Sequence, residues 1–432
     1  MLQLYRDIDS IVKEILLISL SGTDKPGVTV AVSEILSKYQ ANILDIGQAV
    51  IHDHLNIGIL VEIPATHEHS PVLKDILFCA HKLDMKVKFE PISEANYSHW
   101  VEQQGKKRHI VTLLARQITA AQLAAVATVI TRHCLNIDSI KRLSGRIPLS
   151  ALSPQPNQSK EIRQPDNKPA TSKESVEFSV RGKPDDPARL KADFMELSTS
   201  LDADIAFQED NIFRRNRRLV CFDMDSTLIE AEVIDELAKE AGVGQQVAAI
   251  TEAAMRGEID FKKSFTERMR LLSGLDEKEL STIADRLSLT EGAEKLIQTL
   301  KKLGYKTAIL SGGFDYFGHY LQRRLGIDYV FANHLDIENG KLTGKVVTPI
   351  VDGARKAELL KELADKEEIS LEQVIAVGDG ANDLPMLSTA GFGIAFRAKP
   401  LVKASAEHSI QLGLDAILYL IGLNDHDELL AD

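Results

Sequence analysis

Apolar and polar positions in the first quarter of the chain follow two different periods, which predict alternating strands and helices. A helical period runs through Val28–Tyr39 and again near 71–83, whereas the segments around them alternate with a period of two. Breakers in Ser21–Gly27 mark a turn before the first helix. The predicted strands cover residues 14–20, 43–50, 55–63 and 86–90. This order is typical of a ferredoxin-like α+β sandwich with both helices on one face.

A second, degenerate copy of this order follows. Its predicted strands cover 109–115, 136–143, 176–180 and 203–208, and its helices cover 120–134 and 187–200. Between its second and third strands, residues 148–174 contain five prolines and many polar residues, a composition that predicts a disordered insertion. The alternative is an interdomain linker, which would leave two incomplete halves without a common core.

The third part of the chain contains an apolar strand that ends abruptly in acids. Val220–Phe222 is followed by Asp223 and Asp225, with one residue between them. In extended backbone such residues point to the same side, and open α/β sheets bind ligands at the carboxyl ends of their strands. Two neighbouring carboxylates can act as nucleophile and acid where their environments separate their pKa values. An Asx-turn or a helix cap is the structural alternative.

Further polar groups follow other predicted strands in a consistent order. The strand Lys306–Leu310 ends at Ser311 and Gly312, whose hydroxyl and bare backbone amide suit a phosphate group. Lys356 opens a helical run and offers a compact positive charge. After the strand Val374–Gly378, an acidic cluster suits a hard cation such as Mg²⁺; it consists of Asp379, Asn382 and Asp383. Taken singly, each segment is also compatible with an ordinary turn or a solvated lysine.

From about residue 218 onward, these motifs resemble the haloacid-dehalogenase-like phosphotransferases, and within them the phosphoserine phosphatase family. The segments 255–261 and 264–272 are similar to that family's small helical cap. The resemblance implies a doubly wound, mostly parallel α/β sheet with a cap inserted at about 229–290. It also implies Mg²⁺-dependent hydrolysis of O-phospho-L-serine, the last step of serine biosynthesis, through a phosphoaspartyl intermediate.

The resemblance assigns roles residue by residue. Asp223 would be the nucleophile and Asp225 the general acid and base, and Mg²⁺ would lie between Asp223, Asp379 and the backbone carbonyl of Asp225. Asn382 and Asp383 would take supporting or water-positioning roles. The residues implied to bind substrate are Glu232 for the ammonium, Arg268 for the carboxylate, Met255 and Phe261 for the apolar wall, and Ser311, Gly312 and Lys356 for the phosphoryl oxygens, with Asn382 beside them. Without the resemblance, Glu232 and Arg268 would be ordinary solvated charges.

The amino-terminal sandwich resembles ACT domains, the amino-acid-sensing modules of biosynthetic enzymes. That resemblance implies a regulatory ligand such as L-serine at Gly27, with Asp24, Asn42 and Asp45 nearby, and side-by-side pairing into a homodimer. The structural alternative is that Gly27 only permits the turn. The corresponding loop of the second copy, residues 116–119, contains no glycine.

Composition narrows the class of protein. A chain of 432 residues is too long to fold around a single hydrophobic core. We therefore expect three domains: an ACT-like domain at 1–97, a second at 107–210 and a catalytic domain at 211–432. A net charge of −12 argues against a nucleic-acid partner, and no apolar run is long enough for a membrane span. Three separated cysteines and the absence of a signal-peptide pattern favour the cytoplasm. The basic run Arg214–Arg218 is expected to be a solvated linker.

Two other functions remain open at the level of the sequence. The catalytic residues could act on another small phosphomonoester. The chain could also be an amino-acid sensor that carries an inert phosphatase domain, although the complete set of acids, hydroxyl and lysine argues against that hypothesis.

Overall fold

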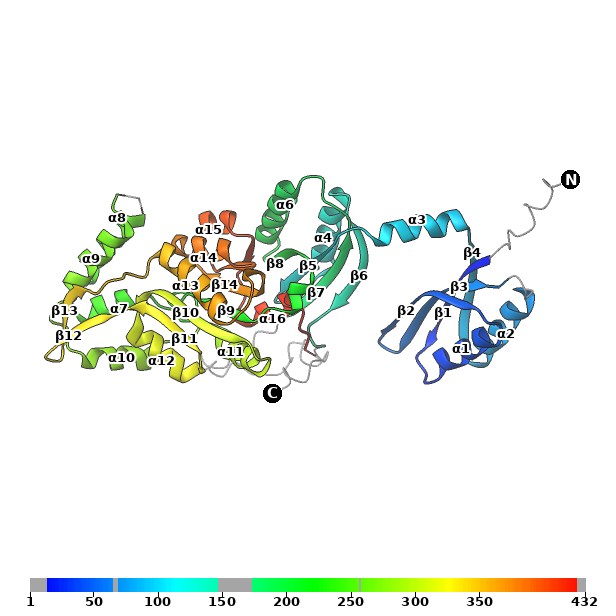
Figure 1. Ribbon diagram of the computed structural model, residues 1–432, viewed down its shortest axis with the longest axis horizontal. Helices are drawn as coiled ribbons and strands as arrows, with labels where there is room; N and C mark the ends of the chain where they lie inside the picture. The colour runs from blue at the N-terminus through cyan, green and yellow to red at the C-terminus, as the bar shows by residue number, and fades with distance from the viewer. Residues whose placement is uncertain (1–13, 65–68, 147–172, 256–257, 426–432) are drawn as a thin grey trace, which may run out of the picture. The chain divides into compact units, whose positions relative to one another are not determined.

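A computed structural model describes residues 14–64, 69–146, 173–255 and 258–425 (Figure 1). By its internal contacts the chain divides into two units, 1–106 and 107–432, which are described separately below. The insertion predicted to be disordered at 148–174 lies almost wholly outside the described residues.

The first unit contains the predicted strand–helix–strand–strand–helix–strand order. Its antiparallel sheet has the strand order β2-β3-β1-β4, and apolar residues of β1, β3 and the two helices, such as Ile18, Val32, Val61 and Ile76, form its core. The elements are β1 (Glu14–Thr23), α1 (Val28–Lys38), β2 (Asn42–Ile51), β3 (His54–Ile63), α2 (His69–Lys82) and β4 (Met85–Ile92). Each lies within a few residues of its predicted position.

One helix of the first unit was not predicted. Helix α3 (Glu94–Gln104) buries no residue, so it has no apolar stripe that a periodicity argument could detect. Its start is fixed instead by Ser93, whose side chain accepts a hydrogen bond from the Asn96 backbone N–H at 3.2 Å.

The second unit begins with a sheet of the same topology. Its strand order, β6-β7-β5-β8, corresponds strand by strand to that of the first sheet and confirms the structural repeat. The elements are β5 (Arg108–Ala115), α4 (Ala120–Arg132), β6 (Asn136–Arg142), β7 (Glu174–Arg181), α6 (Pro187–Ser200) and β8 (Asp204–Glu209). Thr119 and Gln122 form a reciprocal capping box that starts α4.

The remainder of the second unit is a parallel sheet covered by helices, with the strand order β11-β10-β9-β14-β15-β16. Its strands are β9 (Leu219–Phe222), β10 (Lys306–Phe314), β11 (Tyr329–Asn333), β14 (Val374–Gly378), β15 (Phe392–Phe396) and β16 (His408–Ile410). The helices of this part are α11 (Ala293–Lys302), α12 (Asp315–Leu325), α13 (Gly353–Lys366), α14 (Leu384–Thr389), α15 (Pro400–Ser405) and α16 (Ile417–Leu420). Because β10 and β14 flank β9 in register, the residues after all three strands meet at one edge.

Four helices follow β9 and form the predicted cap: α7 (Val233–Glu240), α8 (Gly244–Met255), α9 (Phe261–Leu271) and α10 (Lys278–Arg286). A hairpin that was not predicted, β12 (Leu335–Glu338) and β13 (Lys341–Val346), joins them. Two backbone hydrogen bonds fasten it to the cap, from Gly274 to the Leu342 carbonyl and from Leu342 to the Leu275 carbonyl, at 2.8 and 2.9 Å. Residues 335–346 are thus fastened to the helices that lie within the expected range of 229–290.

The second ACT-like sheet packs directly on the catalytic sheet. Asp204, at the start of β8, accepts backbone hydrogen bonds from Gln411 and Leu412 just after β16, at 2.8 to 2.9 Å. The segment between the two parts contradicts one expectation: Arg214 and Arg217 are only 2% and 5% exposed, so the basic run is not a solvated linker.

These sheets confirm the predicted fold class, a mostly parallel α/β sheet with an inserted helical cap after two ferredoxin-like α+β modules. Within the described ranges, the helices are too short or too polar to span a bilayer.

Candidate active site

Asp223 follows β9 at the centre of the parallel sheet. Its backbone N–H donates to the Val377 carbonyl at 2.8 Å, so the ladder between β9 and β14 extends to the acid itself. Its carboxylate is 2.7 Å from Nζ of Lys356, which lies equally close to Asp383. Lys356 is fully buried in the first turn of α13, where Asp352 caps the helix by accepting the Arg355 N–H at 2.9 Å. The predicted nucleophile and lysine are therefore in direct contact.

The charge on Lys356 is stabilised by these two acids. Burial alone would lower the pKa of its ammonium, but the carboxylates of Asp223 and Asp383 outweigh burial and raise that pKa above its usual value. Lys356 is therefore protonated at neutral pH.

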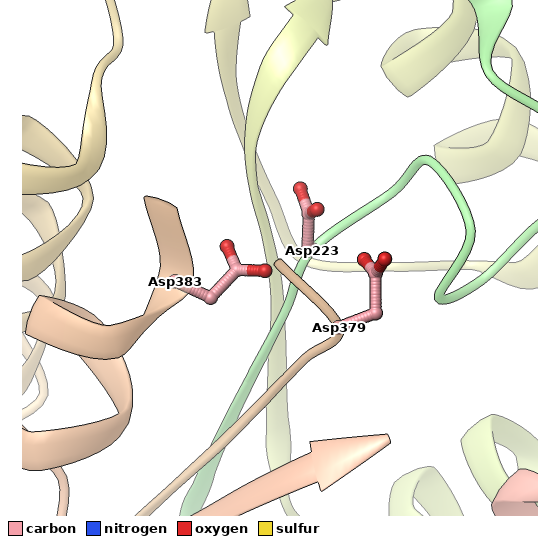
Figure 2. A group of neighbouring side chains, drawn as sticks. All are labelled: Asp223, Asp379 and Asp383. Atoms are coloured by element: carbon pink, nitrogen blue, oxygen red, sulfur yellow. The ribbon is translucent and has the colours of Figure 1, made fainter. Parts of the chain in front are cut away.

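Three carboxylates converge beside this lysine (Figure 2). The oxygens of Asp223, Asp379 and Asp383 lie within 4.8 Å of one another, Asp379 from the loop after β14 and Asp383 from the start of α14. Burial, followed by the charge of Asp223, raises the pKa of Asp379 to about 7 and that of Asp383 to about 6. Three acids against one lysine leave an excess of buried negative charge, and oxygen donors suit a hard divalent cation. This group fits a metal ion.

The composition of this acidic group differs in part from the predicted ligand set. Asp223 and Asp379 are brought together as expected. The Asp225 side chain is not a member, and its predicted contact was through the backbone carbonyl. Asp383, which was assigned a supporting role, lies close enough to contribute an oxygen.

Asp225 occupies an environment different from that of Asp223. The residue is 9% exposed, and its Oδ1 accepts the Val233 N–H at 3.4 Å. Burial, followed by the charges of Glu232 and Asp223, raises the pKa of Asp225 well above its usual value. Asp223 thus contacts a positively charged lysine, whereas the surroundings of Asp225 favour its protonated form. A nucleophile and a general acid need this difference in environment.

The loop after β10 approaches these acids closely. Ser311 is buried, and its Oγ accepts the Gly313 N–H at 3.0 Å. A Cβ added to Gly313 would lie 2.7 Å from Oδ2 of Asp225 and 2.8 Å from Cε of Met224. A side chain at position 313 would therefore displace the Asp225 carboxyl or the end of Met224.

A buried asparagine that the sequence did not single out fixes this loop. Asn333, at the end of β11, donates through Nδ2 to the Gly312 carbonyl at 2.8 Å and accepts the Val351 N–H at the same distance. No spacing signal distinguishes such a residue from a loop asparagine, because its partners are distant in sequence.

Glu232 and Arg268 carry the charges that the cap brings toward the acids. Glu232 precedes α7 and accepts the Ser226 hydroxyl at 2.7 Å, and burial raises the pKa of its partly exposed carboxyl despite that bond. Arg268 on α9 is half-buried, and its Nε is buried without a hydrogen-bond partner among the described atoms. Burial lowers the pKa of Arg268, while Asp235, Glu232 and Asp225 oppose that shift. Its guanidinium thus has a free donor beside three acids.

Of the remaining predicted substrate residues, Phe261 and Asn382 lie in or beside the loops of the site, and the side chain of Met255 is not described. A Cβ on Gly312 would lie 3.4 Å from Cζ of Phe261, so that ring lies over the Ser–Gly–Gly loop. Asn382 Oδ1 would lie 2.2 Å from a Cβ on Gly380, which places the amide in the loop with Asp379. Met255 ends α8, and its side chain lies outside the described residues.

The predicted regulatory residues belong to the first unit. Gly27 precedes α1 with φ of 93°, a conformation that favours glycine, so the turn by itself explains the residue. Asn42 donates to Glu62 at 2.9 Å, and Asp45 accepts the N–H of Ile46 at 2.9 Å. Asp24 is exposed, and its own N–H donates to the Asp53 carbonyl. A ligand at these residues stays a prediction.

Comparison with known proteins agrees with these two kinds of module. Residues 217–391 match the family model described as haloacid dehalogenase-like hydrolase, and residues 14–90 match that of the ACT domain.

Relatives match over nearly the whole chain. A phosphoserine phosphatase of Streptomyces coelicolor is 38% identical, covering 96% of this chain and 94% of its own. A phosphoserine phosphatase of Mycobacterium tuberculosis is 36% identical, with 94% and 93% covered. The crystal structure of a probable phosphoserine phosphatase from Vibrio cholerae has a TM-score of 0.55 at 29% identity, covering 74% of this chain and 87% of its own. The chain belongs to the phosphoserine phosphatase family of haloacid dehalogenase-like hydrolases.

Proposed function

We propose that the protein hydrolyses O-phospho-L-serine to L-serine and phosphate through a phosphoaspartyl intermediate on Asp223, the last step of serine biosynthesis. The observation that carries this proposal is the pairing of two unlike carboxylates at the end of β9. Asp223 contacts the buried Lys356 at 2.7 Å, whereas burial and neighbouring acids favour a protonated Asp225. One acid is thus suited to attack and the other to donate a proton.

The first half of the reaction transfers the phosphoryl group to the enzyme. An Asp223 oxygen forms a bond to phosphorus as the bond from phosphorus to the serine oxygen breaks, and Asp225 gives its proton to that oxygen. In the second half, Asp225 takes a proton from water, and the resulting hydroxide attacks phosphorus and releases Asp223. Splitting one displacement into two gives each step a nearby nucleophile and acid or base.

The charges around the phosphoryl group are distributed over several groups. Magnesium held by Asp223, Asp379 and the Asp225 carbonyl would supply positive charge that offsets the repulsion between a carboxylate and a phosphate. Lys356, the Ser311 hydroxyl and the Gly312 N–H would hold the equatorial oxygens, where charge is spread in the transition state.

Substrate choice rests on the two cap charges. A phosphoserine head group carries an ammonium and a carboxylate, which Glu232 and Arg268 can pair with, the latter through two parallel N–H donors. Phe261 over the Ser–Gly–Gly loop would close the apolar side. The unpaired Nε of Arg268 supports this assignment, since a buried donor without a partner is suited to a substrate carboxylate.

Phosphate release from a panel of phosphomonoesters tests the proposal, with and without Mg²⁺. We expect release that is confined to O-phosphoserine and lost in Asp223→Asn. Arg268→Met should raise KM for O-phosphoserine by about tenfold or more, since it removes a charge-assisted hydrogen bond. The exposed Arg270 lies on the same helix, and Arg270→Met is the matched control.

Broad release in the wild type, or unchanged selectivity in Arg268→Met, would favour another small phosphomonoester as substrate. Absence of turnover together with clear binding of L-serine would favour a sensor with an inert phosphatase domain.

Three further parts of the proposal concern the context of the enzyme. We expect L-serine or another amino acid to act through the first ACT-like module, since its sheet has the predicted topology.

A homodimer is supported by β2, an edge strand whose apolar residues Ile43, Ile46 and Ile51 are 49%, 48% and 71% exposed. A cytoplasmic location agrees with the free thiols of Cys79, Cys134 and Cys221.

A further inference from the structure

A cavity of about 770 Å³ lies between the second ACT-like module and the catalytic sheet, both of which belong to the second unit. Helix α6 and strand β8 line one side of it, and α15, β16, the end of α14 and the loop before β15 line the other. The catalytic acids are not among its lining residues. Its volume falls within the range of about 300–1,000 Å³ that is typical of small-molecule sites.

Arg217 is the buried charge in this cavity. The residue is 5% exposed, and its NH1 donates to the backbone carbonyl of Glu372 at 2.7 Å. Its guanidinium also lies 4.9 Å from the ring centroid of Phe392. It forms no ion pair with any carboxylate in the described ranges, and its other donors are left for the cavity.

The neighbouring Arg214 has the carboxylate counter-ion that Arg217 lacks. It is 2% exposed, and it is paired directly with Glu177 on β7. Burial lowers the pKa of Arg217 only to about 10, so its guanidinium stays charged at neutral pH without such a partner. A buried charge without a counter-ion is costly, and an anionic ligand would supply one.

Aromatic rings form both walls beside this arginine. On the ACT-like side, Phe207 stacks on His109 with a centroid distance of 4.8 Å and lies 6.1 Å from Phe194. On the catalytic side, Phe392 lies 4.4 Å from the ring of His408. Flat apolar walls on either side of one guanidinium suit a planar or apolar group that carries an anion.

The other charges of the cavity do not replace that anion. Glu209 is paired with Lys107 at 3.1 Å, and the Glu407 side chain is 77% exposed. Glu372 is exposed as well; its charge and that of Glu407 oppose the lowering of the Arg217 pKa, but neither carboxylate forms an ion pair with Arg217. The half-buried Lys191 and Lys403 add positive charge, one on each wall. The deepest charge is therefore positive and the acids lie at the rim.

We propose that this cavity binds a small organic carboxylate, with the carboxylate on Arg217 and the apolar part between the two aromatic walls. The planar guanidinium, held flat on Phe392, can meet a carboxylate through two parallel N–H donors. Because residues of both modules form the walls, such a ligand would fasten the second ACT-like module to the catalytic domain.

Calorimetric titration of the full chain with phenylacetate tests this proposal, and phenylacetamide is the neutral probe of matched shape. We expect saturable binding of one phenylacetate per chain and at least tenfold weaker binding of the amide. Arg217→Gln should weaken phenylacetate binding by tenfold or more. Met195→Trp places a larger side chain in the cavity from α6 and leaves Arg217 itself unchanged; it should abolish binding while leaving the melting temperature and phosphatase activity near those of the wild type.

Several results would overturn the proposal. Equal binding of the amide would remove the role of the charge, and unchanged binding in both variants would place the ligand elsewhere. Competition between phenylacetate and O-phosphoserine would assign the binding to the catalytic site. If phenylacetate, 3-phenylpropionate and indole-3-acetate all fail to bind the wild type, the cavity does not take carboxylates.

Discussion

Replacing Lys356 with methionine removes a fully buried ammonium that contacts two carboxylates, each at 2.7 Å. Met fills a similar volume, so the main loss is charge rather than packing. Removing one partner of a buried ion pair costs about 3–5 kcal/mol, because the remaining charge stays buried without compensation. We therefore expect Lys356→Met to destabilise the catalytic sheet by about that amount in a metal-free buffer at pH 7.

The magnitude should depend on pH and on metal. Burial and the charge of Asp223 raise the pKa of Asp383 to about 6 even with Lys356 present, and loss of the lysine raises it further, so protonation of Asp383 at low pH reduces the number of unpaired buried charges. The destabilisation should thus be smaller at pH 5 than at pH 7, and added Mg²⁺ should reduce it by occupying the acidic group.

Hydrogen exchange of peptides from β9 and β14 measures the effect locally, which avoids a single unfolding free energy for a chain with several domains. A loss of about 3–5 kcal/mol corresponds to exchange accelerated roughly 10²-fold to more than 10³-fold. Lys361→Met is the matched control, because Lys361 is an exposed lysine on the same helix. Acceleration below about fivefold, or equal acceleration in both variants, would refute the reasoning.

Other consequences follow from single contacts. Gly313→Ala should lower kcat by at least about tenfold with an unchanged fold, because the added Cβ would lie 2.7 Å from Oδ2 of Asp225. Steady-state kinetics measure kcat, and circular dichroism checks the fold. A wild-type kcat in this variant would contradict the assigned role of the loop. Burial, together with the charge of Arg217, lowers the pKa of His408 from 6.5 to about 3. The folded state therefore binds fewer protons than the unfolded state between these values, and the stability that neutral His408 provides above pH 6.5 is lost as the pH falls toward 3, by about 1.4 kcal/mol per pH unit. His408→Phe should flatten that dependence in melting temperatures recorded from pH 7 to pH 5, whereas an identical slope would contradict it.

The elements that periodicity predicted are those with a buried face. Strands such as β1 and β5 alternate or run apolar, and their helices have apolar stripes, so pattern alone located them. Helix α3 buries nothing and depends on its cap, and the strands β12 and β13 have only four and six residues. Such elements are too short or too polar for a periodicity signal.

The residues of the candidate site also divide into those that the sequence could reveal and those that it could not. Acids and hydroxyls that follow buried strands could be found in the sequence, because strand ends meet at one edge of a parallel sheet. Asn333 could not be found, because its role depends on hydrogen bonds to two backbone groups that are distant in sequence and that only the fold brings close. Arg217 was misinterpreted because a basic run usually is solvated, whereas the fold places this side chain against the Phe392 ring and the Glu372 carbonyl.

The most direct test of the central claim is chemical trapping of the intermediate. Acid quenching of the enzyme during turnover of O-phosphoserine, followed by borohydride reduction, converts an aspartyl phosphate to homoserine, which peptide mass spectrometry can locate. We predict homoserine at position 223 in the wild type and none when O-phosphoserine is left out. Modification at another acid, or phosphate release without any trapped aspartate, would contradict the assignment of Asp223 as the nucleophile.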